Sequence, residues 1–347
     1  MNILMIGPDR SVHGGISAMV NNLFDAGLSS KVNLNYIGTM SEGSKLHKLL
    51  VAAKAYFCFI SKLSWADIVH VNVASDSSFY RKSLFIKAAH RHHKKIVIHQ
   101  HGGNFDEYYM NVMNDGQKEN ARKILGYGDS MIVLTPEYKD FFENQLGIKN
   151  IIVLPNSIKI PEKNFFVQET KAIQLLFLGR VCKTKGVAEL LDAIDILKND
   201  YPNIILYIGG IYEDISFKAR IESMNKNVKF LGWINGTEKE EHLKKSDVFV
   251  LPTYFEGQPI SVLEAMANCC CVVASNVGGI PMMIEDGKDG VLVEPKNVDS
   301  LVNGLRKVIE NPEFAKELTD NAYAKVKSEY SIEQSIDRIV NVYEAIL

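Results

Sequence analysis

The regular alternation of short apolar runs with helical stretches is the feature of this sequence that most constrains its fold. Strands that are separated by helices pair in parallel, and the helices then cover both faces of the sheet. The expected strands are 2–7, 32–39, 67–73, 95–100, 130–135, 151–154, 173–178, 203–210, 228–234, 247–252 and 271–275. The expected helices include 16–28, 45–63, 79–92, 136–146, 187–199, 260–267 and 331–347. We therefore predict an α/β chain of doubly wound parallel sheets.

The length of the chain favours two domains. With 347 residues, of which 46% are hydrophobic and 23% charged, it can bury two separate cores and remain globular. The sequence Pro155-Asn156-Ser157-Ile158 and a polar linker over 161–170 separate the two halves. We predict domains at 1–163 and 164–330, followed by a C-terminal helix at 331–347.

The net charge of −2 conceals an asymmetry between the halves. Residues 1–163 hold 19 Lys and Arg against 14 Asp and Glu, a net of +5, whereas residues 164–347 hold 20 against 27, a net of −7. A net of +5 is too small to indicate a nucleic-acid partner, and neither zinc-ligand spacing nor an RNA-binding aromatic signature occurs. The first half is compatible with an anionic surface or acceptor.

The sequence predicts a protein of the reducing cytoplasm. Residues 1–7 read as a buried strand without a basic leader, and no apolar run approaches the ~20 residues of a spanning helix. Five cysteines, three of them adjacent at 269–271, do not form a disulfide framework. Because these vicinal thiols lack C-x-x-C spacing, we expect them to pack in the core rather than bind metal.

Two glycine-containing turns are candidate phosphate sites. Gly14 and Gly15 follow the first strand, where the backbone can approach a ligand closely and the next helix can offer N–H groups to phosphate. Arg180 and Lys185 lie in a strand-to-helix turn bounded by glycines. Arginine can engage two phosphate oxygens at once and lysine adds a point charge, so this turn predicts a diphosphate site. The order of a Walker loop is absent.

A pair of carboxylates marks the stretch 255–267. Glu256 is expected in a loop and Glu264 inside the helix that follows, with Pro259 in the first helical turn. A glycosidase would need two carboxylates ~5–9 Å apart across one bond, and this arrangement does not require that. It offers a helix N-terminus and two acceptor side chains for sugar hydroxyls. The residues that join the two carboxylates, Gly257, Gln258, Pro259 and Ile260, complete the expected binding loop.

These motifs together resemble family 4 glycosyltransferases, which are retaining nucleotide-sugar enzymes of the GT-B fold. The spacing of Glu256 and Glu264 resembles their Glu-x7-Glu motif, Arg180 and Lys185 their G-R-x4-K-G turn, and Gly14-Gly15 their Gly-rich loop. The resemblance covers nearly the whole chain. It implies two Rossmann-like domains facing a central cleft, with the acceptor bound by 1–163, the donor by 164–330, and the helix 331–347 crossing back to the first domain.

The resemblance also implies a role for each site residue. Arg180 and Lys185 would hold the pyrophosphate, Glu264 the ribose and Glu256 the transferred sugar. Strand alternation alone leaves open whether His99 or His101 reaches the ligand. The resemblance selects His101 as the histidine beside the sugar, and His99 is then expected to be a buried, hydrogen-bonded core residue. Gln258 stands where the family often has Phe, so the identity of the sugar stays open.

The implied function is a retaining, metal-independent hexosyltransferase. It would move a hexose from a nucleotide diphosphate sugar, most simply a UDP-sugar, to a glycan or lipid-linked acceptor in surface polysaccharide biosynthesis. No Asp-x-Asp occurs, so we expect no metal, and the donor is a substrate rather than a cofactor. Two alternatives remain: a GT-B-type epimerase of UDP-N-acetylhexosamine, and a catalytically dead nucleotide-sugar-binding protein.

A membrane surface is a further expected partner, at the inner face of the membrane. The helix 45–63 carries Leu46, Leu49, Leu50, Ala53, Phe57 and Ile60 on one stripe, which favours packing on the sheet. Val51 and Phe59 fall off this stripe near Lys48 and Lys62, which suggests a second face able to lie on a membrane. The basic run 90–95 is expected to be a solvated helix end, with a phospholipid or acceptor site as the alternative.

Overall fold

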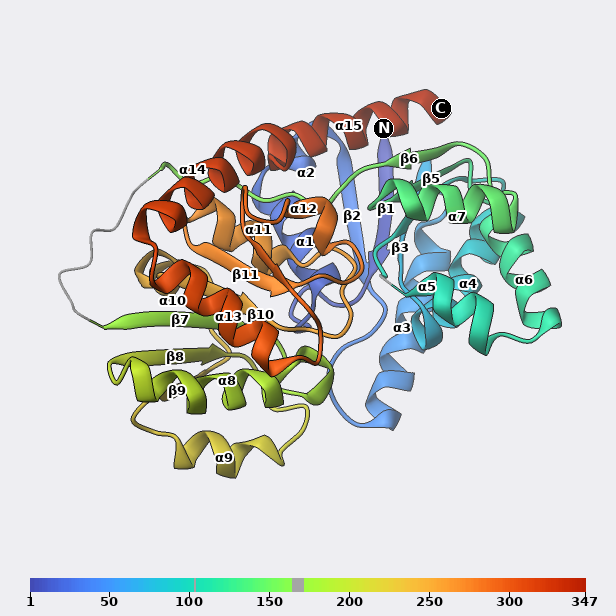
Figure 1. Cartoon of the computed structure of the whole chain (residues 1–347). Coiled ribbons are helices and arrows are strands. Elements are labelled where there is room, and N and C mark those ends of the chain that lie inside the picture. The colour runs from blue at the N-terminus through green and yellow to red at the C-terminus, as the bar shows by residue number, and fades with distance from the viewer. Residues whose placement is uncertain (103, 164–171) are drawn as a thin grey trace. The chain divides into compact units, whose positions relative to one another are not determined.

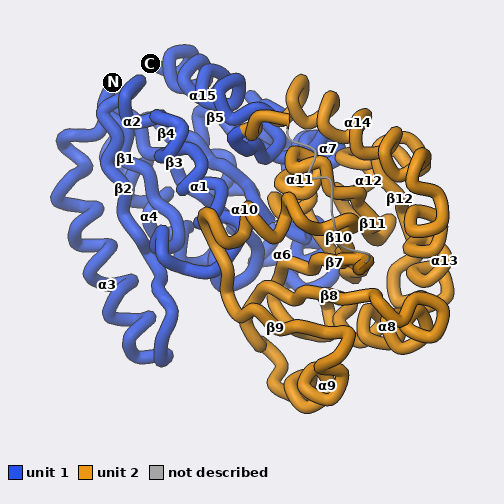
Figure 2. Tube along the Cα trace, turned by 90° about the vertical axis from the view of Figure 1, so that its left-hand side faces the viewer, with its two compact units in different colours: residues 1–159, 331–347 blue, residues 160–330 orange. Residues whose placement is uncertain are grey.

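The chain divides into two compact units. The structure is a computed structural model that describes residues 1–102, 104–163 and 172–347 (Figure 1). Unit 1 comprises Met1–Lys159 and Ser331–Leu347, and unit 2 comprises Ile160–Tyr330 (Figure 2). The last helix therefore belongs to unit 1, although it follows unit 2 in the sequence. Residues 164–170 of the expected linker lie outside the described residues.

Unit 1 contains a six-stranded parallel sheet in the order β2-β1-β3-β4-β5-β6. Its strands are β1 Asn2–Gly7, β2 Asn33–Gly38, β3 Ile68–Val73, β4 Lys95–Gln100, β5 Ser130–Val133 and β6 Ile151–Val153. Its helices are α1 Gly15–Asp25, α2 Leu28–Lys31, α3 Lys45–Lys62, α4 Asp76–Arg91, α5 Phe105–Glu107, η1 Tyr108–Val112, α6 Asp115–Leu125, α7 Pro136–Leu146 and α15 Ile332–Ile346. The inner strands are almost entirely buried, as parallel sheets covered on both faces require.

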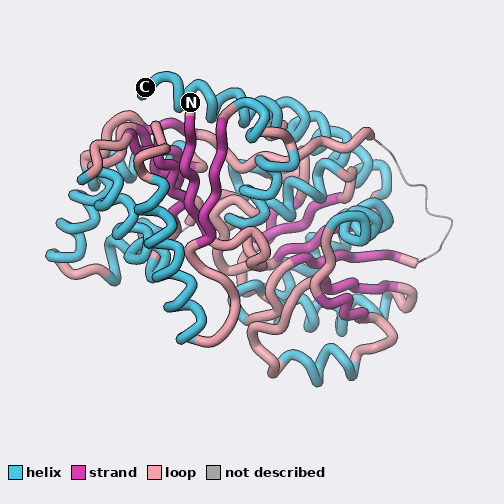
Figure 3. Tube along the Cα trace, turned by 180° about the vertical axis from the view of Figure 1, so that it is seen from behind, coloured by secondary structure: helices cyan, strands magenta, loops and turns pink. Residues whose placement is uncertain are grey.

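Unit 2 contains a second six-stranded parallel sheet, in the order β12-β11-β10-β7-β8-β9. Its strands are β7 Ile173–Leu178, β8 Ile204–Gly209, β9 Val228–Gly232, β10 Val248–Leu251, β11 Cys271–Ser275 and β12 Val291–Val293. Its helices are η2 Lys183–Lys185, α8 Val187–Asp200, α9 Phe217–Ser223, α10 Gly236–Lys245, α11 Ile260–Ala267, α12 Ile280–Met283, α13 Val298–Ile309 and α14 Pro312–Glu329. In Figure 3 the strands of each unit are flanked by helices. The predicted doubly wound α/β class is confirmed in both units.

Some helices were not predicted from the sequence. No helix was expected between 101 and 129, where α5, η1 and α6 lie, and none was expected over 298–329, where α13 and α14 lie. Only Ala121, Ile124 and Leu125 are buried in α6, whereas α13 buries Leu301, Val302, Gly304, Leu305 and Val308. The few apolar side chains of α6 give a weak signal, but the apolar spacing in α13 is one that a sequence can reveal.

The predicted buried face of α3 is wrong. The stripe assigned to the core is exposed at Leu46, Leu49, Leu50 and Phe57, whereas Phe59, expected to face away, is fully buried. Ala55 and Phe59 point inward, and Phe59 packs edge-on against Phe85 of α4 with 5.0 Å between the ring centroids. Both stripes of the helix are apolar, so periodicity could not identify the one that meets the sheet.

The C-terminal helix α15 is anchored in unit 1 by a buried stripe. Ile332, Ile336, Ile339 and Tyr343 are buried, as their helical spacing predicts, while Leu347 is exposed. The hydroxyl of Tyr343 lies 2.6 Å from Nδ1 of His70 on β3, so the stripe ends in a buried hydrogen bond. A search of the described residues finds no helix whose length and hydropathy would let it traverse a lipid bilayer.

Candidate functional site

The order of strands in unit 2 places its candidate site at the junction of β7 and β10. From β7 the sheet proceeds to β8 and β9 on one side, and from β10 to β11 and β12 on the other. Ligands of open α/β sheets bind at the carboxyl ends of the strands where this order reverses. The loop that holds Arg180 and Lys185 follows β7, and the loop that holds Glu256 follows β10. Both predicted motifs thus flank the switch point of the sheet.

Gly186 lets the backbones of these two loops pack in direct contact. Gly186, which ends η2, has φ +70°, and a Cβ at this position would lie 1.8 Å from the carbonyl oxygen of Pro252 after β10. No other residue fits there without moving the backbone. The backbone N–H of Tyr254 adds a hydrogen bond of 2.9 Å to the carbonyl of Thr184. The cationic turn is therefore held firmly against the loop of Glu256.

Lys185 and Glu256 form an ion pair at this junction. Nζ of Lys185 contacts Oε1 of Glu256, and both side chains are largely buried. The carbonyl of Glu256 accepts from the backbone N–H of Gly279, and a Cβ at Gly278 would lie 1.8 Å from that same carbonyl. Glu256 is thus fixed through both its side chain and its backbone. Nζ of Lys185 retains two donors that an anionic ligand can take.

Arg180 lies in the same turn but is more open to solvent. Its Nη1 lies 2.8 Å from Oε2 of Glu213, and both side chains are about half exposed. An exposed pair of this kind contributes little to stability, so a ligand can replace Glu213 at small cost. Glu213 carried no signal in the sequence, because it follows β8 as an ordinary loop residue.

The binding loop ends in the short helix α11. Pro259 occupies the N-cap rather than the first turn, which corrects the prediction by one position, and Ile260 is the first helical residue. Pro259, Gln258 and Ile260 have little exposure. Gly257 precedes them in the loop after β10, half-exposed. The structure therefore brings all eight residues predicted for unit 2 onto three neighbouring segments.

Glu264 on α11 has a partner that the sequence did not reveal. Its Oε1 lies 2.6 Å from Nζ of Lys239 on α10, and both side chains are mostly shielded from solvent. Lys239 belongs to a run of charged residues, 238–245, that reads as a solvated helix surface. Only the packing of α10 beside α11 shows that this lysine orients a candidate ligand-binding carboxylate.

We expect Lys239→Met to raise the KM for the nucleotide-sugar donor about tenfold and to leave kcat nearly unchanged. Loss of one charge-assisted hydrogen bond, worth ~1.5–3 kcal/mol, frees the carboxylate of Glu264 from its fixed direction. Steady-state kinetics would measure both parameters. Lys244→Met on the same helix, which removes an exposed pair with Glu240, is the matched control. Equal KM values for the two variants would contradict an orienting role for Lys239.

Unit 1 contains a buried row of histidines on one face of its sheet. His70 on β3 and His99 on β4 lie 5.4 Å apart between ring centroids, and His99 stacks on His101 at 3.9 Å. His99 is buried as expected, but neither of its ring nitrogens has a hydrogen-bond partner, contrary to the prediction. Burial lowers the pKa of His70 to about 3 and depresses the pKa of His99 strongly, so both are neutral at physiological pH.

His101 is half-buried at the end of β4, and its hydrogen bond fixes its tautomer. The Nδ2 amide of Asn72 donates to the carbonyl of Ile6 at 3.0 Å, which leaves Oδ1 of Asn72 as an acceptor. Nε2 of His101 lies 2.7 Å from this oxygen and must therefore carry the proton. Burial, followed by the charges of His70 and Lys82, lowers the pKa of His101 to about 3. A neutral ring with a free acceptor at Nδ1 results.

Further residues surround the carboxyl edge of this sheet. Lys82 on α4 is fully buried, and its Nζ donates to Oγ1 of Thr39 at 2.6 Å. Burial and then the charge of Arg81 hold the pKa of Lys82 well below its usual value. Gly14 is the N-cap of α1 and Gly15 is its first residue, and a Cβ at either would meet no atom within 4 Å. The backbone there is open to an approaching ligand.

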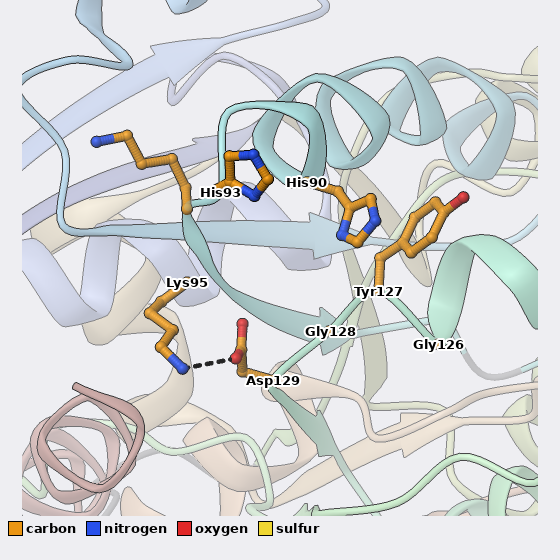
Figure 4. Close-up of a pocket in the computed structure, with 8 residues that line it drawn as sticks. His90, His93, Lys95, Gly126, Tyr127, Gly128 and Asp129 are labelled. Atoms are coloured by element: carbon orange, nitrogen blue, oxygen red, sulfur yellow. Dashed lines mark hydrogen bonds and ion pairs between the residues drawn. The ribbon is translucent and has the colours of Figure 1, made fainter.

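A shallow depression of about 380 Å³ lies elsewhere in unit 1 (Figure 4). It is lined by His90, His93, Lys94, Lys95, Gly126, Tyr127, Gly128 and Asp129. The rings of His90 and Tyr127 stack at 3.8 Å, and Lys95 pairs with Asp129 at 3.0 Å. Because β4 begins at Lys95, the depression lies at the amino ends of the strands, away from the edge where ligands of such sheets bind. It contains none of the predicted site residues.

The cysteines and the acidic side chains provide no metal site in the part of the chain that the structure describes. Within it, no three His, Cys, Asp or Glu side chains are grouped to hold an ion. Cys270 and Cys271 are buried, and burial raises the pKa of Cys271 to about 12. Cys270 and Cys271 therefore pack in the core as expected, whereas Cys269 is only half-buried.

Sequence comparisons relate the chain to glycosyltransferases. The family model described as "Glycosyl transferases group 1" matches residues 159–325, nearly the whole of unit 2. An uncharacterized glycosyltransferase, MJ1069, of Methanocaldococcus jannaschii is 26% identical over 79% of this chain and 75% of its own length. A poly(ribitol-phosphate) alpha-N-acetylglucosaminyltransferase of Staphylococcus aureus is 26% identical over 75% of this chain and 53% of its own length.

A solved structure shows the same fold over the full chain. Anabaena Alr3699/HepE in complex with UDP superposes with a TM-score of 0.76, covering 99% of this chain and 100% of that chain. The sequence identity is 16%, so this likeness concerns the fold.

Proposed function

We propose that this chain, a glycosyltransferase of the GT-B type, is a retaining, family 4 enzyme that transfers a hexose from a nucleotide diphosphate sugar. UDP-sugars are the proposed donors, and a glycan or lipid-linked molecule of a surface polysaccharide is the proposed acceptor. Unit 2 would bind the donor and unit 1 the acceptor. A membrane surface is a further proposed partner.

The observation that carries this proposal is the convergence of Arg180, Lys185 and Glu256 at the switch point of unit 2. Arg180 and Lys185 would bind a diphosphate, and Glu256 would accept hydrogen bonds from sugar hydroxyls. The three residues lie on two loops in direct contact, so they suit a ligand in which a diphosphate is joined to a sugar. Glu264 lies on the helix that starts from the same loop and offers a second acceptor for hydroxyl groups. The UDP complex of Alr3699/HepE and the acceptor named for the Staphylococcus aureus relative support the proposed substrate classes.

In the proposed reaction, negative charge develops on the departing diphosphate, next to the side chains of Arg180 and Lys185. The bond between the sugar C1 and the diphosphate oxygen breaks, and the acceptor oxygen bonds to C1 from the same face. The acceptor proton passes to the departing diphosphate. Arg180 and Lys185 would stabilise the leaving diphosphate, since preorganised cations act best on charge that develops in the transition state. Glu256 would hold sugar hydroxyls, and Glu264 the ribose.

Unit 1 would supply groups for the transferred sugar and for the donor phosphates. The neutral ring of His101 has an acceptor at Nδ1 that suits a sugar hydroxyl. The open backbone of Gly14 and Gly15 is proposed to approach the diphosphate. Both roles are what the family resemblance implies.

A screen of nucleotide sugars by thermal shift tests the donor assignment. A ligand at ~100 times its Kd should stabilise the protein by ~2.7 kcal/mol. We expect a clear shift with UDP and with one or a few UDP-sugars. The protein would then be incubated with the stabilising UDP-sugar and candidate acceptors, and NMR of the product would show transfer with retention of configuration at the sugar C1. Turnover without an acceptor, with inversion at one sugar carbon, would instead assign an epimerase.

We expect sugar transfer to persist in excess EDTA. Arg180 and Lys185 carry the positive charge that a bridging divalent cation provides in metal-dependent transferases, and no Asp-x-Asp occurs in the sequence. Initial rates measured before and after chelation should agree within about twofold. A rate that collapses with EDTA and returns with Mn²⁺ or Mg²⁺ would refute metal independence.

A further inference from the structure

We propose that the outer surface of the helical layer formed by α3, α4 and η1 in unit 1 docks on an anionic lipid membrane. This inference rests on the proposed function, in which the acceptor is a glycan or lipid-linked molecule. We call this surface the docking face. Its apolar members are Leu46, Leu49, Leu50, Phe57, Tyr80, Leu84, Met110 and Val112.

The largest part of the docking face is an apolar stripe on α3. Leu46, Leu49, Leu50 and Phe57 are 67%, 66%, 60% and 75% exposed. Their spacing, completed by Ala53, places them along one side of the helix. Single exposed apolar residues are ordinary on a soluble protein, but a contiguous group of large ones marks a surface that meets another apolar body.

Exposed apolar side chains also occur on α4 and η1, which follow α3 in unit 1. Tyr56 of α3 packs on Phe85 of α4 at 5.5 Å, and Phe79 of α4 packs on Phe105 of α5 at the same separation of ring centroids. Figure 2 shows α3 and α4 lying next to each other in unit 1. The outward side chains of these elements, Tyr80, Leu84, Met110 and Val112, are exposed. These ring contacts place α4 beside both α3 and α5, and η1 follows α5 directly in the chain.

The charges around this surface identify its occupant. Helix α3 carries four lysines and no acidic residue, and the exposed Lys45 and Lys54 lie one helical turn from Leu49 and Leu50, respectively. On α4 the stripe of Tyr80 and Leu84 continues into Lys87 and Arg91. Apolar side chains that enter the acyl boundary, with cations at the level of the headgroups, are what an anionic membrane binds. A symmetric contact with a second copy would place lysines against lysines.

Flotation with lipid vesicles tests the docking face. We expect the wild-type protein to float with phosphatidylcholine vesicles that contain about one third phosphatidylglycerol, and more weakly with phosphatidylcholine alone. The triple variant Leu49→Glu/Leu50→Glu/Phe57→Glu should lower the partition coefficient at least about 100-fold, because three side chains lose burial in the acyl boundary. All three positions are exposed, so the fold should persist. Ile215→Glu, at a position of unit 2 that is 67% exposed, is the matched control and should float like the wild type.

Three outcomes would overturn the proposal. They are a wild-type protein that stays in the soluble fraction, a triple variant that floats like the wild type, and equal flotation with neutral and anionic vesicles. A concentration-dependent dimer that the triple variant abolishes would assign the face to a second copy instead. The thermal shift with UDP is measured in every variant. Absence of that shift in the wild type would refute the proposed function while leaving the flotation result intact.

Discussion

Lys185→Ala is expected to lower kcat/KM for sugar transfer by about 10²–10³-fold and to weaken UDP binding about tenfold or more. The ammonium group would stabilise the leaving diphosphate, and loss of one such preorganised donor typically costs this much in rate. The substitution also leaves the mostly buried carboxylate of Glu256 without its cation, so that it would repel the diphosphate. Steady-state kinetics and calorimetric titration with UDP measure the two effects.

Lys183→Ala provides the matched control for this experiment. Lys183 lies in the same 3₁₀ turn, two residues earlier, but its side chain is exposed. Its removal changes the net charge of the turn equally and should alter kcat/KM by less than about threefold, because an exposed charge is screened by solvent. If Lys185→Ala bound UDP with unchanged affinity, the diphosphate assignment would fail.

His101→Ala is expected to lower kcat at least ~10²-fold with little change in UDP affinity. A positioned group that acts on the reacting sugar contributes about this much. The imidazole is held through Asn72, whose amide is itself fixed by the carbonyl of Ile6, so its geometry is set before any ligand binds. Single-turnover kinetics with saturating donor would isolate the chemical step.

His99→Leu is the control, and the pH profile is a second check. His99 is buried without hydrogen-bond partners, so an apolar replacement leaves no polar group unsatisfied and should retain near-normal kcat. Because the pKa of His101 is lowered to about 3, its ring stays neutral above about pH 4. It should add no inflection to kcat between pH 5 and 8. Loss of activity in His99→Leu alone, with both proteins folded, would show that the wrong histidine has been chosen.

The sequence by itself determined the fold class and the positions of the binding turns. Strands such as β1 and β7 are mostly apolar runs between loop residues, and both were predicted to the residue. A short, mostly buried strand has no alternating polar face whose pattern could be misread, so composition and length identify it. The turns of Arg180 and Lys185, and of Glu256, were found because they follow such strands directly.

Only the tertiary structure decided which side chains face which neighbour. Phe59 rather than Leu49 meets the sheet, because α3 has two apolar sides and the packing partner selects one. Lys239 reaches Glu264 although 25 residues separate them in the sequence, and Asn72 reaches His101 across two paired strands. The tautomer of His101 follows from that last contact. Such pairings depend on the order of the strands and on the helices that cover them, which local residue patterns do not encode.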